Sequence, residues 1–236
     1  MLEIKGYLGT SLIEWPGKIS AVVFLAYCNF RCPFCHNSEL VLPPQKLKNI
    51  PLDFVFADLQ ARRKFVDGVA ITGGEPTLAK GLKEFVQKLK KEGFGVMIET
   101  NGTHPEVIED FNRQNLVDFW SMDVKAPLRA ENYSRVVGVK VDEDLLSKIK
   151  KSISLIKEFG EYEFKTTVVP TLLEKRDIIE IAQFLGPVKR YYLQQFRPKN
   201  CLDPNFEKIK PYAREYLLQI LEEIKRYIPN TVFREE

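Results

Sequence analysis

The sequence predicts an α/β fold, an incomplete TIM-like barrel of parallel strands with six strand–helix units. Two observations predict it. Apolar segments typical of buried strands alternate with amphipathic segments typical of helices, and the connections between them are short. Polar residues also gather directly after the carboxyl ends of successive strands, where barrel enzymes build their sites. A doubly wound open sheet is the alternative, and the repeated placement of polar residues favours the barrel.

Each unit begins with a short, strongly apolar segment. The first of these, SAVVFLAY, is a continuous apolar run, which suits a strand buried on both faces. We expect strands at 20–27, 68–72, 94–100, 117–124, 162–169 and 190–196. Leucine and phenylalanine spacings of three and four predict the helices between them. We expect these at about 52–65, 77–92, 105–113, 174–185 and 211–227, with one more inside 141–160.

The composition sets limits on the class of protein. Of 236 residues, 44% are hydrophobic and 28% charged, which is typical of a folded globular protein and not of a disordered or membrane protein. A net charge of +3 gives no indication of a nucleic-acid partner. The start of the chain lacks the layout of a secretory signal, so we expect a cytoplasmic protein. We expect one domain over 1–236, with an N-terminal extension (1–19), a barrel core (20–200) and a C-terminal helical segment (201–236).

Three cysteines follow the first expected strand at the spacing Cys-x3-Cys-x2-Cys: Cys28, Cys32 and Cys35. Thiols stay reduced in the cytoplasm, so this density indicates metal or redox chemistry. A structural zinc completed by His36 or the distant Cys201 is one interpretation. An iron–sulfur cubane is the other, and three thiolates would leave one of its irons without a protein ligand. Such an open position could take a substrate or cofactor directly.

At these residues the sequence resembles a known family. CNFRCPFC, with its aromatic residue before the last cysteine, and GGEP after the second strand resemble the radical S-adenosylmethionine (SAM) enzymes. The longer string SLIEWPGKISAVVFLAYCNFRCPFCHNSELV is similar to the enzymes that activate glycyl-radical proteins, and among them to the activators of anaerobic ribonucleoside-triphosphate reductase. His36 and Asn37 favour this activating branch. The later segments IETNG, MDVKAP and LQQFRP also fit it, so the resemblance covers essentially the whole chain.

The resemblance implies a cluster, a cofactor and a radical reaction. Cys28, Cys32 and Cys35 would hold one [4Fe–4S] cluster, and SAM would bind its fourth iron. Reductive cleavage of SAM would give a 5′-deoxyadenosyl radical that abstracts hydrogen from a glycine of the partner enzyme, with no acid or base residue. A flavodoxin or ferredoxin-type protein would supply the electron. Three alternatives stay open: activation of pyruvate formate-lyase or another glycyl-radical enzyme, a radical SAM reaction on a small molecule, and a zinc-stabilised binding module.

The resemblance also implies SAM contacts in the first half of the chain. Gly73 and Gly74 would bring backbone close to the methionine amine, and Glu75 would anchor their turn. Glu99 would accept hydrogen bonds from the ribose hydroxyls. Thr100 would shape the turn after the third strand, a place where the family sometimes binds a monovalent cation. As ordinary structural residues, these would form a βα loop and a carboxylate paired with a lysine.

The resemblance implies further contacts from residues before Gly73 and after Thr100. Lys125 would balance the methionine carboxylate, with Asp123 on the same side of its strand. Phe34 would pack on the adenine, and Lys165 and Gln195 would either contact the cofactor or fill the barrel. The last two residues implied are His36 and Asn37, beside the third cysteine.

The chain departs from the family pattern at two positions. Tyr27 precedes the first cysteine where many relatives have glycine, and Glu99 stands where some activating enzymes have aspartate. We therefore expect an altered exit from the first strand and a longer ribose contact. No further cysteine group lies between Cys35 and Gly68, which argues against an inserted ferredoxin-like segment with additional clusters.

Overall fold

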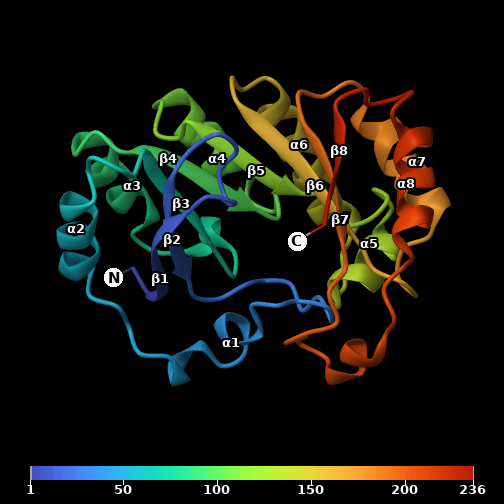
Figure 1. Cartoon of the computed structure of the whole chain (residues 1–236), viewed down its shortest axis with the longest axis horizontal. Helices are drawn as coiled ribbons and strands as arrows, with labels where there is room; N and C mark the ends of the chain where they lie inside the picture. The colour runs from blue at the N-terminus through green and yellow to red at the C-terminus, as the bar shows by residue number, and fades with distance from the viewer. Residues whose placement is uncertain (1, 236) are drawn as a thin grey trace. The chain divides into compact units, whose positions relative to one another are not determined.

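The computed structural model describes residues 2–235 as helices that alternate with the strands of one sheet (Figure 1). The strand order follows the sequence from β1 to β8. The first pair is antiparallel, and β2–β3, β3–β4, β6–β7 and β7–β8 are parallel. The strands are β1 (Ile4–Ser11), β2 (Ser20–Leu25), β3 (Gly68–Gly73), β4 (Gly95–Thr100), β5 (Phe119–Asp123), β6 (Tyr162–Val168), β7 (Tyr191–Gln195) and β8 (Thr231–Arg234).

Helices occupy most of the connections between these strands. Their bounds are α1 (Ser38–Val41), α2 (Leu52–Ala61), α3 (Leu82–Lys91), α4 (Pro105–Arg113), α5 (Ala130–Val137), α6 (Glu143–Lys157), α7 (Lys175–Leu185) and α8 (Arg214–Ile224). Short 3₁₀ turns at Pro44–Lys46, Pro76–Leu78 and Pro204–Lys208 each begin with proline, whose fixed φ suits a first helical position. None of the helices within residues 2–235 has the length and apolar character needed to cross a membrane.

The residues group into two compact units. The first unit contains the chain up to Asn29, together with Glu39–Thr100 and His104–Trp120. The second unit contains Phe30–Ser38, Asn101–Thr103 and the chain from Ser121 onward. The boundary divides β5 after Trp120, and each unit has its own buried side chains.

The first unit packs an apolar row across its parallel strands. Val22 on β2 pairs in register with Ala70 on β3, which pairs with Met97 on β4. Trp15 covers this row and packs against Phe119, with ring centroids 6.1 Å apart. Helices α2 and α3 also lie side by side in this unit, joined by an edge-to-face aromatic contact (Figure 1). Dense packing of this kind fixes the strand ends that carry the polar residues.

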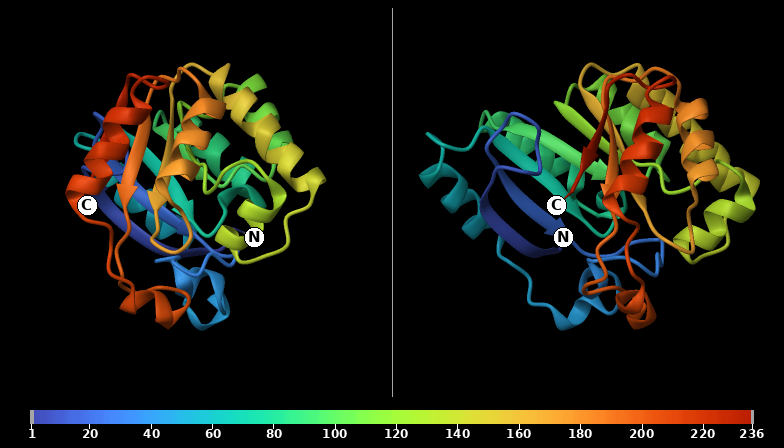
Figure 2. Two further views of the ribbon diagram at one scale, coloured as in Figure 1. Left: turned by 90° about the vertical axis from the view of Figure 1, so that its right-hand side faces the viewer. Right: turned by 45° about the vertical axis from the view of Figure 1, so that its right-hand side comes forward.

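The second unit ends in a helix that returns to the sheet. Helices α7 and α8 lie side by side next to β7 and β8, as all views of the ribbon show (Figure 2). The buried residues Leu217, Ile220 and Ile224 give α8 an apolar face at helical spacing. Strand β8 follows this helix and pairs with β7 in parallel.

The α/β class with mostly parallel strands is confirmed. All six expected strands are present, and β1 and β8 are additional. The helix expected over 77–92 begins later, because Gly81 adopts a left-handed backbone with φ 86° and separates α3 from the turn before it. Helix α5, an eight-residue element, was not expected.

Candidate functional site

The cysteine segment, residues 28–35, follows the end of β2. It begins in the first unit and continues into the second. Tyr27 has a left-handed backbone with φ 70°, an uncommon conformation for a residue with a side chain. Its N–H donates to the carbonyl of Leu40 at 2.9 Å, and its carbonyl accepts from the N–H of Glu75 at 2.6 Å. The strand therefore ends in a sharp turn, and half-buried Cys28 follows it.

Two glycines lie directly against this turn. A Cβ atom on Gly73 would lie 2.3 Å from the carbonyl oxygen of Leu25, and one on Gly74 would lie 1.9 Å from that of Tyr27. Gly73 also has φ 124°, a backbone conformation that side chains disfavour. The N–H of Gly74 donates to the Leu25 carbonyl at 2.9 Å. The glycines are thus needed for close packing of backbone against the residues that precede Cys28.

Glu75 anchors the turn from inside the first unit. Its side chain is 1% exposed, and its Oε1 accepts hydrogen bonds from the backbone N–H of Thr77 at 3.1 Å and from the hydroxyl of Thr77. The hydroxyl of Thr100, at the end of β4, donates to the same oxygen at 2.8 Å. Thr77 was not among the expected site residues. Its signal is the acidic cap before Pro76, a pattern that starts a helical turn.

Glu99 lies on the neighbouring strand end of the same unit. It is half-buried, and the hydroxyl of Thr72 donates to its Oε2 at 2.6 Å. Thr72 and Glu99 thus connect the carboxyl ends of β3 and β4 through a charge-assisted hydrogen bond. The first unit therefore brings Gly73, Gly74, Glu75, Glu99 and Thr100 to adjacent strand ends.

In the second unit the cysteine segment forms a tight turn. The N–H of Cys35 donates to the carbonyl of Cys32 at 3.0 Å, and Cys32 is 6% exposed. Burial raises the pKa of the Cys35 thiol, while the backbone N–H of Asn37 and the charge of Lys125 oppose this. Phe34, between the two thiols, is 9% exposed. This loop holds two thiols in a shielded but not fully closed environment.

Two contacts connect this turn to the loop that follows β7. An imidazole nitrogen of His36, Nε2, lies 2.8 Å from the carbonyl oxygen of Arg197, which fits donation from Nε2–H. The N–H of Asp203 donates to the carbonyl of Pro33 at 2.9 Å. Cys201 lies buried in the same loop, and burial raises its pKa.

Lys125 and Asp123 form an ion pair just past β5, with Nζ 3.4 Å from Oδ2. The lysine side chain is 17% exposed. Burial would lower its pKa, but the charges of Asp123, Cys32 and Cys35 outweigh that effect and raise it. Lys125 therefore keeps its positive charge beside the thiols of Cys32 and Cys35.

The remaining two expected residues face different ways. Lys165 is 8% exposed and shares the face of β6 that carries Glu163. Gln195 lies on the same side of β7 as the buried Leu193, and its amide donates to the carbonyl of Tyr212 at 3.0 Å. That bond connects Gln195 to the segment before α8.

Within residues 2–235, no three His, Cys, Asp or Glu side chains are grouped closely enough to bind a single metal ion. A cubane cluster has a different requirement, since it takes one thiolate for each of three irons. Cys28, Cys32 and Cys35 form no disulfide. As soft ligands within eight residues of chain, they fit the donor set of an iron–sulfur cluster.

Comparisons with known proteins extend these observations to the whole chain. A protein of Methanocaldococcus jannaschii that is provisionally named a glycyl-radical enzyme activating enzyme is 39% identical to this chain over 235 residues. The match covers 98% of this chain and 95% of that protein. A second protein of that organism with the same provisional name is 28% identical over 215 residues, which cover 84% and 79% of the two chains.

A solved structure and a family model also match this chain. The crystal structure of QueE from Escherichia coli matches with a TM-score of 0.56 and 17% identity, covering all of this chain and 93% of that one, which shows a shared fold. The model of the radical SAM superfamily matches residues 22–185, which include the three cysteines and the glycine turn. The chain belongs to the radical SAM superfamily.

Proposed function

We propose that this radical SAM enzyme generates a glycyl radical on a partner protein, and that the partner is an anaerobic ribonucleoside-triphosphate reductase. The observation that carries the proposal is the Cys-x3-Cys-x2-Cys segment, packed at Tyr27 against the Gly73–Gly74 turn. The near full-length similarity to a provisionally named activating enzyme supports it. The choice of reductase depends on the motif resemblance alone.

The cofactors of the family are a [4Fe–4S] cluster and SAM, and the residues present fit both. Cys28, Cys32 and Cys35 would hold the cluster. When bound, the cluster and SAM supply a 5′-deoxyadenosyl radical that takes hydrogen from the partner's glycine. Lys125 would bind the methionine carboxylate as a cation. The backbone of Gly73 and Gly74 would lie close to the methionine amine, because neither residue carries a side chain.

The other expected residues orient or enclose the cofactor in this proposal. Glu99, which accepts a hydrogen bond from Thr72, would also accept hydrogen bonds from the ribose hydroxyls. Phe34 would exclude water beside the adenine. The proposed contacts that complete the set are His36, Asn37, Glu75, Thr100, Asp123, Lys165 and Gln195. A monovalent cation near Thr100 is also part of the proposal.

The electron would come from a flavodoxin or ferredoxin-type donor, since radical generation needs one electron for each SAM cleaved. No side chain described here is proposed to act as a general acid or base. The chain's own contribution is to bind, orient and shield, which replaces a chance encounter by an oriented one.

The decisive experiment combines anaerobically reconstituted enzyme, SAM, a reductant and a candidate anaerobic reductase. We expect the electron paramagnetic resonance signal of a glycyl radical on the reductase and one 5′-deoxyadenosine per radical. Cys32→Ala should abolish both, and Cys201→Ala, outside the proposed ligand set, should retain both. Release of 5′-deoxyadenosine without a glycyl radical would contradict the proposed partner. Its release by Cys32→Ala would contradict the cluster assignment.

A further inference from the structure

Tyr133, in α5, has two contacts within the second unit that point to a specific role. The side chain is fully buried, and its hydroxyl accepts a hydrogen bond from the backbone N–H of Lys125 at 3.2 Å. Its ring packs at a tilt of 54° against Phe30, with centroids 6.3 Å apart. Phe30 lies in the cysteine segment, two residues before Cys32. One side chain therefore contacts both the lysine and the segment that carries the thiols.

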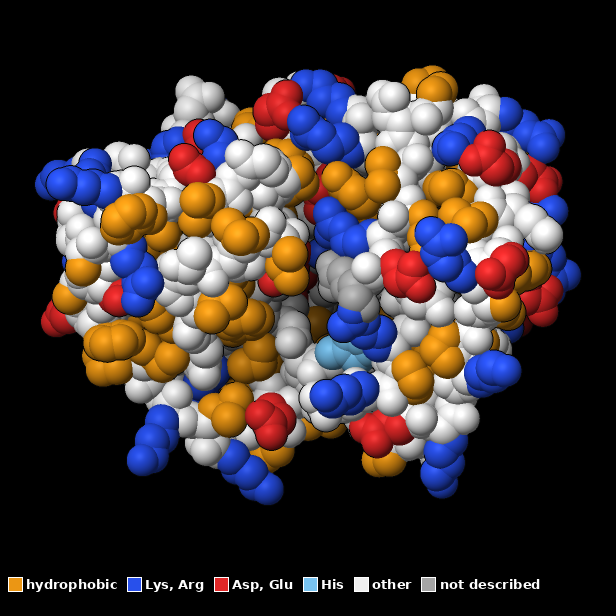
Figure 3. All heavy atoms as spheres, viewed as in Figure 1, with side chains coloured by type: hydrophobic (Ala, Val, Ile, Leu, Met, Phe, Trp, Pro, Cys, Tyr) orange, Lys and Arg blue, Asp and Glu red, His pale blue; other side chains and the backbone are white. Residues whose placement is uncertain are grey.

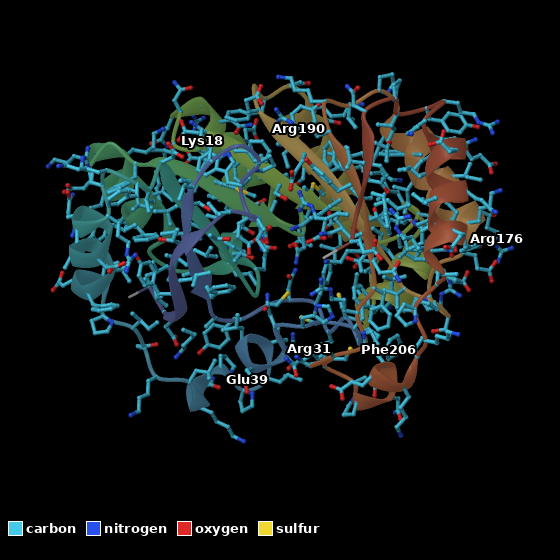
Figure 4. All side chains as sticks on the ribbon, viewed as in Figure 1. Lys18, Arg31, Glu39, Arg176, Arg190 and Phe206 are labelled. Carbon is cyan, nitrogen blue, oxygen red and sulfur yellow. The ribbon has the colours of Figure 1, made fainter. Side chains whose placement is uncertain are left out.

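The end of the same helix contacts the cysteine segment again. The N–H of Arg31, which is labelled in Figure 4, donates to the carbonyl of Val137 at 2.8 Å. Gly138 ends α5 with φ 69°, and a Cβ atom there would lie 2.2 Å from the carbonyl oxygen of Arg31. The close approach is possible only because this residue has no side chain. Helix α5 thus holds the cysteine segment at Phe30 and at Arg31.

We propose that α5 sets the position of the cysteine segment relative to Lys125, with Tyr133 as a positioning residue for SAM binding and Gly138 as the contact that lets the helix approach. The inference rests on the proposed function, because it concerns the same cofactor. Tyr133 acts through Lys125 and Phe30 and does not itself touch the cofactor.

The argument follows from what Lys125 must do. A cation binds a carboxylate well only when it is held at a fixed distance from the group that the rest of the ligand contacts. The Tyr133 hydroxyl holds the backbone of Lys125, and its ring holds the loop of Cys32. Loss of the hydroxyl should therefore loosen the lysine and leave the ring contact in place.

The chain offers a matched control for this test. Tyr162 is also buried, at 4% exposure, and its hydroxyl also accepts from a backbone N–H, that of Lys189 at 3.4 Å. Tyr133→Phe and Tyr162→Phe thus remove the same chemical group from similar environments. Tyr162 lies at the start of β6, outside the proposed SAM-binding set. A general loss of packing would affect both variants alike.

The first measurement is equilibrium binding of SAM to the reconstituted holoenzyme. We expect Tyr133→Phe to weaken binding about threefold or more, and Tyr162→Phe to match the wild type. The same small decrease in unfolding temperature in both variants would show that folding is not the cause. Equal SAM affinity in Tyr133→Phe and wild type would overturn the role of Tyr133.

The second measurement does not depend on the cofactor. In cluster-free, full-length protein, we expect Gly138→Ala to raise the alkylation rate of Cys32 and Cys35 about threefold, because the displaced Arg31 carbonyl loosens the loop. Gly186→Ala is the control, since Gly186 also ends a helix with positive φ but has nothing within 4 Å of its Cβ position. An unchanged rate in Gly138→Ala, or an equal rise in both variants, would overturn the proposal even if glycyl-radical formation is confirmed. Failure of the wild type to bind a cluster would instead contradict the proposed function.

Discussion

One buried face of the strands differs in character between the two units. In the first unit, the row Val22, Ala70 and Met97 is apolar and is covered by Trp15. In the second unit, one face of β6 carries Glu163, which is fully buried, and Lys165, which pairs in register with Tyr192 on β7. The guanidinium of Arg234 lies over the Tyr192 ring, 3.9 Å from its centroid.

The difference separates an apolar core from a charged strand face. The first unit contributes shape, since an apolar core fixes the strand ends where glycine backbone and the buried Glu75 form a tight turn. The second unit has charged groups instead, with Lys125 beside the thiols of Cys32 and Cys35, and Glu163 and Lys165 on β6.

Figure 3 shows hydrophobic side chains gathered over the first unit, near β1 and α2. Leu8 on β1 and Phe54 on α2 are among the exposed large hydrophobic residues of this unit.

Removal of the Trp15 ring, which covers the apolar row, should have the largest effect. It tests the apolar core of the first unit. We expect Trp15→Ala to lower the free energy of unfolding by about 3–5 kcal/mol, because a large cavity would remain above the apolar row. Val232→Ala is the control in the second unit, since Val232 is 51% exposed and should cost less than about 0.5 kcal/mol. Urea denaturation measures both. Similar values for the two variants would contradict an apolar core that depends on Trp15.

A methyl group at the glycine turn should have the next largest effect. Gly74→Ala places a Cβ 1.9 Å from the Tyr27 carbonyl oxygen, so the backbone before Cys28 must shift. We expect a loss of about 1–3 kcal/mol in unfolding free energy, together with lower iron content after reconstitution. Gly160→Ala, where nothing lies within 4 Å, is the matched control and should retain full iron content. Normal iron loading of Gly74→Ala would show that the turn does not set the cysteine segment.

The polar face of the second unit can be tested at Ser121. Its hydroxyl donates to Oε1 of the buried Glu163 at 2.8 Å. We expect Ser121→Ala to cost about 1–2 kcal/mol, because a buried carboxylate loses a hydrogen-bond donor. Ser154→Ala, an exposed serine on α6, should be nearly neutral. Differential scanning calorimetry of the two variants would settle this. A neutral result at Ser121 would mean that the polar face is less specific than its contacts indicate.

The sequence predicted the parallel strands well, because each has a short apolar run with a helix pattern behind it. Strand β1 was missed because Gly6 and Gly9 interrupt its pattern, and its antiparallel pairing with β2 is a long-range property. Strand β8 has four residues and directly follows a helix, so no periodicity marks it.

Most of the polar strand ends were foreseen by the same logic, but Lys165 lies in the middle of β6 and not at its end. The orientations of these residues were not foreseen. Alternation places Gln195 with Leu193 on one side of β7 and Gln194 on the other, a signal that was available in the sequence. The role of Tyr133 was not available. It depends on a contact with Phe30, more than a hundred residues away along the chain, which only folding brings about.

The smallest expected effect concerns surface charge, where the two units should behave alike. Lys83, Arg113 and Gln114 hold the pKa of Asp110 at about 2, below the usual value of 3.8. A depressed folded-state pKa stabilises the protein above about pH 4, and this contribution disappears as the pH falls toward 2. Asp110→Asn should therefore be slightly less stable than wild type at pH 7 and equal to it near pH 2, as urea denaturation across this range would show. Glu161→Gln in the second unit should show the same sign, because Arg190 and Lys189 lower the pKa of Glu161. If the stability difference between one variant and the wild type did not change with pH, the stability lost in that variant would come from packing and not from charge. The surfaces of the two units would then differ as their interiors do.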